Sequence, residues 1–163
     1  MVETLTTQIA AGEAELAQLL SQDEAWAPVA ARLQTIKGIG FLTALQVLVT
    51  THNFTRCVTA EQAAADAGLV PSPRRSGTSV RGRMGIGQTG NARLRRALYL
   101  ATLSAAQHNP IIKAFYERLR AAGKPMKGAR CAAARKLLHL AFAVVMHDQP
   151  FDRLSFQKQQ AVA

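Results

Sequence analysis

Apolar positions recur every three or four residues along most of the chain, and this pattern predicts a mainly α-helical fold. After a first helix over 3–20, helices are expected near 26–35, over 41–49, from Thr59 to Gly68, from Asn91 to Asn109, from Pro110 to Gly123 and from Gly128 to about His147. Two of these carry capping signals, which are Thr59 with Gln62 three residues later, and Asn91. Residues 71–90 are rich in glycine and proline and predict a loop or a short hairpin.

The first helix carries apolar residues at the spacing of a coiled-coil seam, with alternating steps of four and three residues: Leu5, Ile9, Leu16 and Leu19. Gly12 occupies the middle of the seam, where it supplies no side chain and costs about 1 kcal/mol of helix propensity against alanine. The seam is therefore too short and too interrupted to be a secure coiled coil by itself. Either the helix packs on the domain surface, which the pattern favours, or it pairs with a second copy or with helices from outside this chain.

The chain has 163 residues, of which 48% are apolar, and this suits one globular domain. We divide it into an acidic coiled-coil-like helix at 1–24, a helical domain at 25–152 and a tail at 153–163. No apolar run is long enough to span a membrane. The two cysteines, Cys57 and Cys131, stand far apart, which argues against a zinc site and suits the reducing cytoplasm.

Charge is distributed unevenly, and the distribution points to a nucleic-acid partner. The formal net charge is +10, and all 20 lysines and arginines lie after residue 24. Between Asp66 and Glu117 there is no acidic residue, whereas that stretch holds many arginines and Lys113. Arginine can bind phosphate through two parallel hydrogen bonds, so this stretch predicts contact with a polyanion. A merely solvated basic surface is the alternative.

Two glycines separated by one apolar residue lie between two expected helices, in the sequence Thr35-Ile36-Lys37-Gly38-Ile39-Gly40. This spacing resembles a helix-hairpin-helix motif. Gly38 and Gly40 would let the backbone approach a phosphate, the next helix would offer free N–H groups, and Lys37 would add a positive charge. Such contacts hold the DNA backbone without reading its sequence. A plain tight turn is the alternative.

The loop after Gly68 sets hydroxyl groups among guanidinium groups. Its arginines are Arg74, Arg75, Arg81 and Arg83, and Arg93, Arg95 and Arg96 follow at the start of the next helix. In one interpretation the arginines bind phosphates and the serines only fill the loop. In the other, a serine hydroxyl attacks a DNA phosphodiester while arginines stabilise the phosphoryl charge. The residues alone favour the first interpretation, because no base is visible beside Ser76.

Several short motifs occur in a fixed order that resembles one known family. They are Ile36-Lys37-Gly38-Ile39-Gly40, Ala67-Gly68-Leu69-Val70-Pro71, Ser76-Gly77, the run from Gly90 to Tyr99, His108-Asn109-Pro110 and Phe115-Tyr116-Glu117-Arg118-Leu119. Residues 35–152 resemble the C-terminal transposase domain of bacterial insertion-sequence transposases that combine a RuvC-like DEDD domain with a catalytic serine. These proteins are also called bridge-RNA-guided recombinases.

The resemblance implies a role for each part of the basic region. Ser76 matches the family's serine nucleophile, which forms a covalent link to DNA during strand exchange, with Ser72 and Ser79 as rivals if the loop register slips. The hairpin and the basic loop would contact DNA or the guide RNA. Several protomers would assemble, with an active site shared between domains.

The metal-binding carboxylates of that family lie in an N-terminal RuvC-like domain that this sequence does not contain. The few acidic residues after residue 24 are scattered, so no metal site is expected here, and Mg²⁺ would belong to the RuvC-like domain of the intact family. We therefore expect a C-terminal half that binds nucleic acid and does not cleave DNA unaided. The alternatives are a stand-alone nucleic-acid-binding module and an assembly fragment that works through the 3–20 helix.

Overall fold

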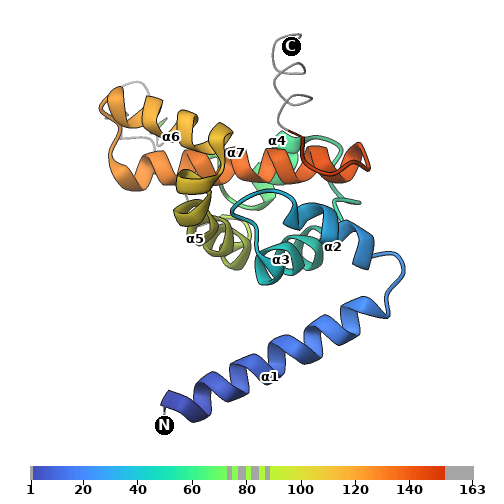
Figure 1. Ribbon diagram of the computed structural model, residues 1–163. Helices are drawn as coiled ribbons and strands as arrows, with labels where there is room; N and C mark the ends of the chain where they lie inside the picture. Colours follow the sequence, from blue (N-terminus) through green and yellow to red (C-terminus); the bar gives the residue numbers. More distant parts are fainter. Residues whose placement is uncertain (1, 73–74, 77–79, 82–84, 87–88, 153–163) are drawn as a thin grey trace.

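The structure, a computed structural model, describes residues 2–72, 75–76, 80–81, 85–86 and 89–152. Within them the chain is mainly helical, as expected (Figure 1). The helices are α1 (Val2–Ser21), α2 (Ala27–Gln34), α3 (Phe41–Thr51), α4 (Ala60–Asp66), α5 (Ala92–His108), α6 (Pro110–Ala121) and α7 (Met126–Met146). Four two-residue strands lie between α4 and α5: β1 (Pro71–Ser72), β2 (Arg75–Ser76), β3 (Val80–Arg81) and β4 (Gly85–Ile86). The expected loop with a hairpin is thus a paired ribbon.

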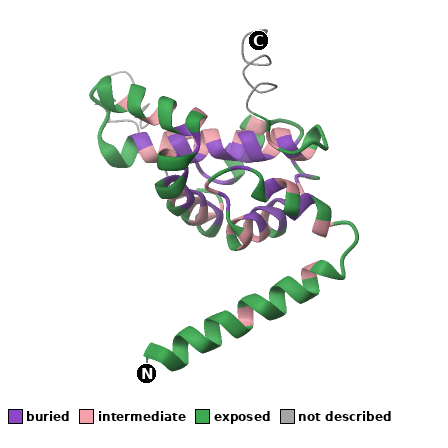
Figure 2. Cartoon of the chain, in the orientation of Figure 1, coloured by how far each residue is buried: buried purple, intermediate pink, exposed green. Residues whose placement is uncertain are grey.

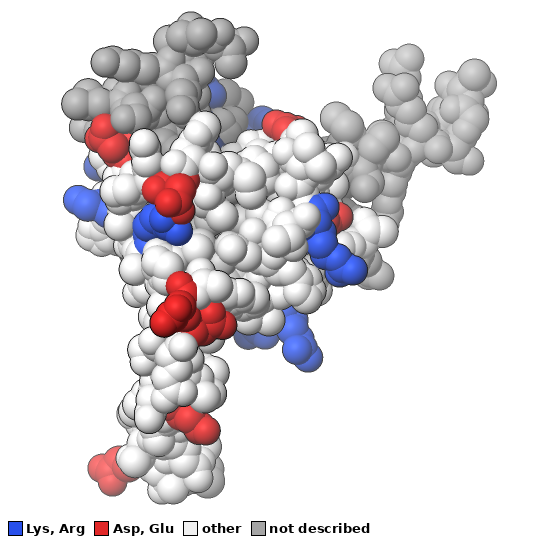
Figure 3. Space-filling view, turned by 90° about the vertical axis from the view of Figure 1, so that its right-hand side faces the viewer, with Lys and Arg blue, Asp and Glu red and all other residues white. Residues whose placement is uncertain are grey.

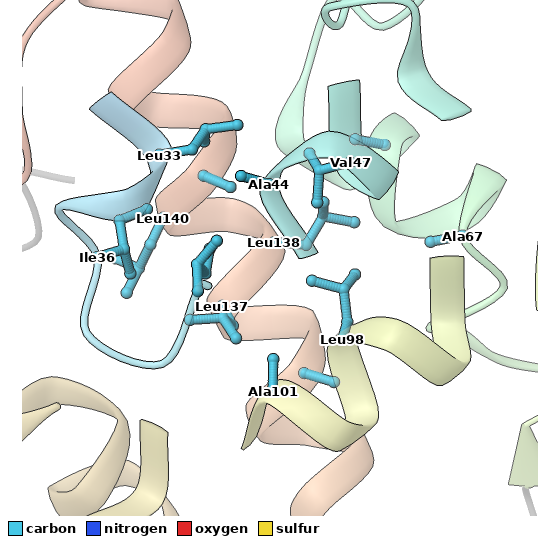
Figure 4. Packing of buried hydrophobic residues seen from close by; sticks show 14 of the residues in the cluster. Leu33, Ile36, Ala44, Val47, Ala67, Leu98, Ala101, Leu137, Leu138 and Leu140 are labelled. Carbon is cyan, nitrogen blue, oxygen red and sulfur yellow. The ribbon is translucent and has the colours of Figure 1, made fainter. Parts of the chain in front are cut away.

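The core forms where α7 passes the other helices, since α2, α4, α5 and α6 all pack against it. Figure 4 shows Leu98 and Ala101 of α5 gathered with Leu137 and Leu138 of α7. Each of these leucines is fully buried. Complete burial of a leucine side chain contributes about 1.5–3 kcal/mol, so α7 is the main source of stability for the helical body.

Side-chain caps set the starts of α4, α5 and α6, and the first two come from Thr59 and Asn91. The Thr59 hydroxyl accepts from the Gln62 N–H at 3.2 Å, and the Gln62 side chain accepts from the Val58 N–H at 2.8 Å. The Asn91 carboxamide oxygen accepts from the N–H groups of the first turn of α5, both at 3.0 Å. These contacts confirm the caps expected at Thr59 and Asn91 and satisfy N–H groups that a helix leaves open.

The first helix packs on the body only at its C-terminal end, where Leu20 lies partly buried against the core, and the rest of its described length does not. No residue of α1 is buried, and its seam residues stay open to solvent, with Ile9 62% and Leu19 58% exposed. Figures 1 and 2 show α1 extending away from the other helices and exposed along its length. The favoured expectation of a surface helix packed on the domain is therefore wrong. The physical reason is that the apolar seam of α1 has no facing groove among the described residues.

An unusual turn follows α3 and brings an aromatic ring into the core. His52, Asn53 and Phe54 all have positive φ angles, a conformation that costs free energy for residues with side chains. The Thr51 hydroxyl compensates by accepting from the Phe54 N–H at 3.1 Å. Phe54 is 1% exposed and meets Phe142 of α7 edge to face, with ring centroids 5.3 Å apart. The burial of this ring offsets the cost of the turn.

Residues 148–152 close the body against α2. Arg32 forms an ion pair with the Asp148 carboxylate, and the Thr35 hydroxyl accepts from the Phe151 N–H at 2.8 Å. The expected tail at 153–163 lies outside the described residues. In the part of the chain that is described, no helix is long and apolar enough to cross a membrane.

Candidate nucleic-acid interface

The turn between α2 and α3 packs closely against α5 at Gly38. Ile36 and Ile39 are buried, whereas Lys37 between them is exposed. Gly38 has φ +104°, and a Cβ atom there would lie 2.7 Å from the Ala105 Cα of α5. Glycine is therefore required at this position both by the backbone conformation and by the close approach of α5. Gly38 positions the turn, and the exposed residues beside it remain available to a partner.

Asn109 fixes the same turn from the junction of α5 and α6. Its buried side chain donates from Nδ2 to the Lys37 carbonyl at 3.2 Å. Its Oδ1 accepts from the N–H groups of Ile111 and Ile112, at 3.1 Å and 3.4 Å, and so caps α6. One side chain thus links the turn to the start of α6.

Gly40 is the N-cap of α3 and leaves the start of that helix open. It is exposed, and a Cβ there would meet no atom within 4 Å. Within the described residues no side chain caps α3, and its first turn holds no acidic residue. The free N–H groups of a helix start favour an anion. Lys37 and Gly40 therefore lie where a phosphate could approach, whereas Gly38 faces α5.

A clamp formed by Gly68, Gly90 and Arg95 closes the base of the ribbon. The Arg95 guanidinium donates from Nη1 to the Thr89 carbonyl at 3.0 Å and the Gly68 carbonyl at 3.4 Å. Gly90 has φ +85°, and a Cβ there would lie 2.7 Å from the carbonyl oxygen of Asp66. The clamp holds the two ends of the ribbon together at the start of α5.

The strand register places the ribbon residues relative to one another. β1 pairs with β4, and β2 pairs with β3, both antiparallel. In the second pair Arg75 lies opposite Arg81, and Ser76 lies opposite Val80. Ser76 is therefore in the strand pair farther along the ribbon from the clamp. Three residues of interest, Arg74, Ser79 and Arg83, lie outside the described residues.

The three arginines at the start of α5 differ in their surroundings. Arg93 and Arg96 are exposed, whereas Arg95 is half-buried and its Nη1 contacts carbonyl oxygens of the clamp. The helical phase explains the difference, because Arg95 lies about 100° around the helix from Arg96. Arg93 and Arg96 remain open to a phosphate, while Arg95 supports the ribbon.

The structure adds basic residues that the sequence analysis did not select. The start of α7 lies near Arg95, since that guanidinium opposes the rise that burial causes in the pKa of the Cys131 thiol. The first turns of α7 carry Lys127 and Arg130, with no acidic residue in the first turn. Basic residues are placed unfavourably at a helix start unless an anion lies nearby. The repetition of this pattern on α5 and α7 was visible in the sequence and could have identified these positions.

Charge on the body contrasts with charge on α1. Figure 3 shows only acidic side chains among the charged residues of the projecting helix. On α6 and α7, the cations of Arg118 and Lys136 both lie over the Phe115 ring, 5.4 Å and 5.1 Å from its centroid. Burial and the neighbouring Arg118 lower the pKa of Lys136. Two positive charges thus lie close together at this point of the body, and such a pair favours an anion nearby.

No group of three or more histidine, cysteine, aspartate or glutamate residues comes together within the described ranges. The acidic residues of these ranges therefore do not form a two-metal centre, which needs several converging carboxylates.

Residues 30–117 match the model of the family described as Transposase IS116/IS110/IS902 family. The chain belongs to this family. The matched stretch contains the α2–α3 turn, the ribbon with Ser76 and the arginines at the start of α5, and it ends before the α6–α7 turn. Membership in the family confirms the coarser part of the resemblance noted in the sequence.

Curated proteins of three bacteria are similar to 68–76% of this chain. It is 34% identical over 118 residues to the insertion element IS110 uncharacterized 43.6 kDa protein of Streptomyces coelicolor, which covers 72% of this chain and 29% of that protein. It is 34% identical over 125 residues to the pilin gene-inverting protein of Moraxella lacunata, which covers 76% of this chain and 39% of that protein. The insertion element IS900 uncharacterized 42 kDa protein of Mycobacterium paratuberculosis is 30% identical over 112 residues, with 68% and 28% covered. The chain spans about a third of the length of these relatives.

Proposed function

We propose that this chain is the nucleic-acid-contacting, serine-bearing domain of a DNA transposase or recombinase. The observation that carries the proposal is the clamp, which holds the ribbon containing Ser76 at the basic start of α5. Family membership supports the same conclusion, because a transposase must hold DNA while its strands are exchanged. The pilin gene-inverting relative is named for inverting a gene, which is a rearrangement of DNA.

The proposed contacts to the DNA backbone come from two elements. The α2–α3 turn acts as a helix-hairpin-helix motif, with Lys37 and the open start of α3 at Gly40 binding phosphate. Arg93 and Arg96 on α5 bind the same strand or its neighbour. In the ribbon, the register of β2 and β3 sets Arg75 opposite Arg81, one position along the strands from Ser76. This strand pair is where the proposed phosphate would be bound.

The proposed reaction conserves the energy of the phosphodiester bond. The Ser76 hydroxyl oxygen attacks the phosphorus, a bond from serine to phosphorus forms, and the bond from phosphorus to a deoxyribose oxygen breaks. The serine proton passes to solvent, and the released deoxyribose oxygen takes up a proton. Nearby arginines stabilise the charge on the phosphoryl oxygens. Attack by the freed hydroxyl of another strand reverses the step, releases Ser76 and completes the exchange.

The remaining parts of the activity would come from outside these residues. In the intact family a RuvC-like domain would hold Mg²⁺ through its carboxylates, and a guide RNA would select the DNA site. The exposed seam of α1 supports assembly of two or more protomers through this helix, because an apolar seam is stable only when it is covered. The chain by itself would bind nucleic acid without cleaving it.

Binding is tested with the full chain and a DNA duplex over a range of salt concentrations. If about six phosphates are contacted, affinity should fall about a thousand-fold between low and physiological salt. The double variant Arg93→Gln with Arg96→Gln should reduce the salt dependence by about two phosphate contacts. A salt-independent affinity would contradict the electrostatic part of the proposal.

The nucleophile is tested in a full-length relative, at the serine aligned with Ser76. Its change to alanine should abolish DNA rearrangement and the covalent protein–DNA adduct while DNA binding stays near normal. Alanine at the positions aligned with Ser72 and Ser79 provides matched controls, which should retain activity. Rearrangement that persists without the aligned serine would refute its role.

A further inference from the structure

A cavity of about 480 Å³ lies at the foot of the ribbon, beside the start of α5. It is formed by the end of α3, the segment after it, the end of α4 and the residues that precede α5. Its lining includes Thr51, Arg56, Cys57, Asp66, Asn91 and Leu94. Arg93 and Arg96 flank Leu94 in the sequence of α5, so the cavity lies beside the helix start that is proposed above to contact nucleic acid. None of the contacts proposed above involves this cavity.

The chemistry of the walls is mixed. Leu94 is buried and supplies an apolar surface, while Asp66 supplies a carboxylate and Arg56 an exposed guanidinium. The Cys57 thiol donates to the Asp66 Oδ2 at 3.5 Å, which holds the carboxylate in place. Burial and the Asp66 carboxylate raise the pKa of Cys57, so the thiol keeps its proton. In the described part of the chain, this thiol is the one side chain that forms a hydrogen bond with the carboxylate.

Asn91 provides a second directed polar group. Its Oδ1 is engaged in capping α5, which turns the amide so that Nδ2 is left as a donor. Among the described residues no acceptor contacts that Nδ2. The cavity thus combines one acceptor-only carboxylate, one amide donor and one cation, with an apolar wall between them.

We propose that the cavity receives one unstacked guanine of the bound nucleic acid. Guanine presents two parallel N–H donors, at N1 and N2, which match the two oxygens of a carboxylate, and its O6 can accept from an amide. Adenine and cytosine pair their amino group with a ring acceptor that a carboxylate would repel. The phosphate of the same nucleotide would lie near Arg56. This inference rests on the proposed function, because the guanine comes from the strand held by Arg93 and Arg96.

The energetic terms are compatible with this site. Unstacking a base costs a few kcal/mol, and less in a single strand. A bidentate contact to the correct base discriminates against another by about 1–3 kcal/mol, which corresponds to roughly a 5- to 150-fold difference in affinity. The site would therefore read one base, whereas the surrounding arginines bind the backbone of any sequence.

The test uses NMR of the ¹⁵N-labelled full chain, titrated separately with the 5′-monophosphates of guanosine, adenosine, cytidine and uridine. We expect guanosine monophosphate to shift the amide signals of Cys57, Asp66 and Asn91 saturably, at an affinity at least five-fold above the other three. Asp66→Asn should remove this preference, because the amide replaces one acceptor by a donor. Equal shifts with all four nucleotides, or shifts confined to Arg93 and Arg96, would overturn the guanine site.

A second variant keeps the test decisive if Asp66→Asn alters the fold. Ala65 lines the cavity on α4, and Ala65→Leu would fill space there without disturbing the helix. It should abolish guanosine monophosphate binding while salt-dependent binding of duplex DNA persists; unchanged nucleotide binding would count against the site. If the unmodified chain does not bind duplex DNA, the proposed function is refuted, whatever the nucleotide result.

Discussion

The Asn109 side chain donates a hydrogen bond to the main-chain carbonyl of Lys37, 3.2 Å away, and joins segments 72 residues apart in the sequence. Because the same side chain caps α6, the turn that carries Lys37 is built into the junction of α5 and α6. A residue without a role at the interface itself thereby determines where the interface lies.

Two substitutions of Asn109 separate its bond to the Lys37 carbonyl from its capping of α6. Asn109→Ala should lower the free energy of unfolding by about 2 kcal/mol or more, since it removes a cap and leaves the Lys37 carbonyl without its donor. Asn109→Asp retains the capping oxygen and loses only the donor. Its free energy of unfolding should therefore lie between those of the unmodified protein and Asn109→Ala. Urea unfolding measures both, and equal stability of all three proteins would disprove the linkage.

Gly38→Ala should destabilise the fold more than any other glycine change in this turn. The added Cβ would meet α5 at Ala105, and the φ of +104° is unfavourable for alanine, so we expect a loss of about 2 kcal/mol or more. Gly40→Ala is the matched control, because its surroundings are open and only the capping preference changes. Thermal unfolding compares them, and similar midpoints would show that α5 does not constrain the turn.

Arg95 and Arg96 should respond in opposite ways to the same substitution. Arg95→Gln breaks the clamp, so limited proteolysis within 71–90 should become faster. Arg96→Gln should leave proteolysis unchanged and weaken DNA binding, because that side chain is exposed. If both variants are cleaved at the rate of the unmodified protein, Arg95 does not hold the ribbon.

His139 makes stability depend on pH. Its Nε2 is buried without a hydrogen-bond partner among the described residues, and burial together with Arg135 lowers its pKa below the ordinary 6.5, although Glu61 opposes this. Below pH 6.5 the unfolded chain binds a proton that the folded chain refuses, so stability is complete above pH 6.5 and falls as the pH drops toward the folded-state pKa.

The measurement is urea unfolding between pH 5 and 8. His139→Leu should flatten the acidic part of the curve, whereas the exposed His108→Gln should leave it unchanged. An acidic decline that is the same in His139→Leu would assign the effect to other groups.

Removal of residues 1–19 should leave the unfolding midpoint of the body nearly unchanged, because α1 has no buried residue. If α1 mediates assembly, the same truncation should reduce the mass measured by light scattering to that of a monomer. Gly12→Leu should have the reverse effect, since a Cβ there meets nothing within 4 Å and a leucine would complete the seam. An identical mass for all three proteins would exclude assembly through α1.

Local signals in the sequence predicted the helices well, because capping residues act on their own neighbours. Thr59 and Asn91 both begin helices where their side chains can reach the next turn, and Pro110 begins α6 as its fixed φ angle favours. The packing of α1 could not be predicted in the same way. A seam of apolar residues specifies that a partner exists, and the pattern does not say whether the partner belongs to the same chain.

In the candidate site, too, local features could be predicted from the sequence and contacts between distant segments could not. The run of arginines predicted a basic surface, but only the phase of α5 shows that Arg95 turns toward the clamp while Arg93 and Arg96 stay exposed. In the sequence Asn109 was visible only as the end of the helix that begins at Asn91 and as part of the His108-Asn109-Pro110 motif. Its bond to Lys37 could not be predicted, because it depends on how distant segments fold together. The roles of Ser76 and the ribbon arginines stay predictions, to be decided by the experiments above.

Both ends of the ribbon leave the body at one place, where Gly68 meets Gly90 beneath Arg95. A segment attached in this way is modular, since its length and composition can change without moving any helix of the core. Grafting the corresponding segment from another family member onto this body would therefore yield a hybrid that folds normally.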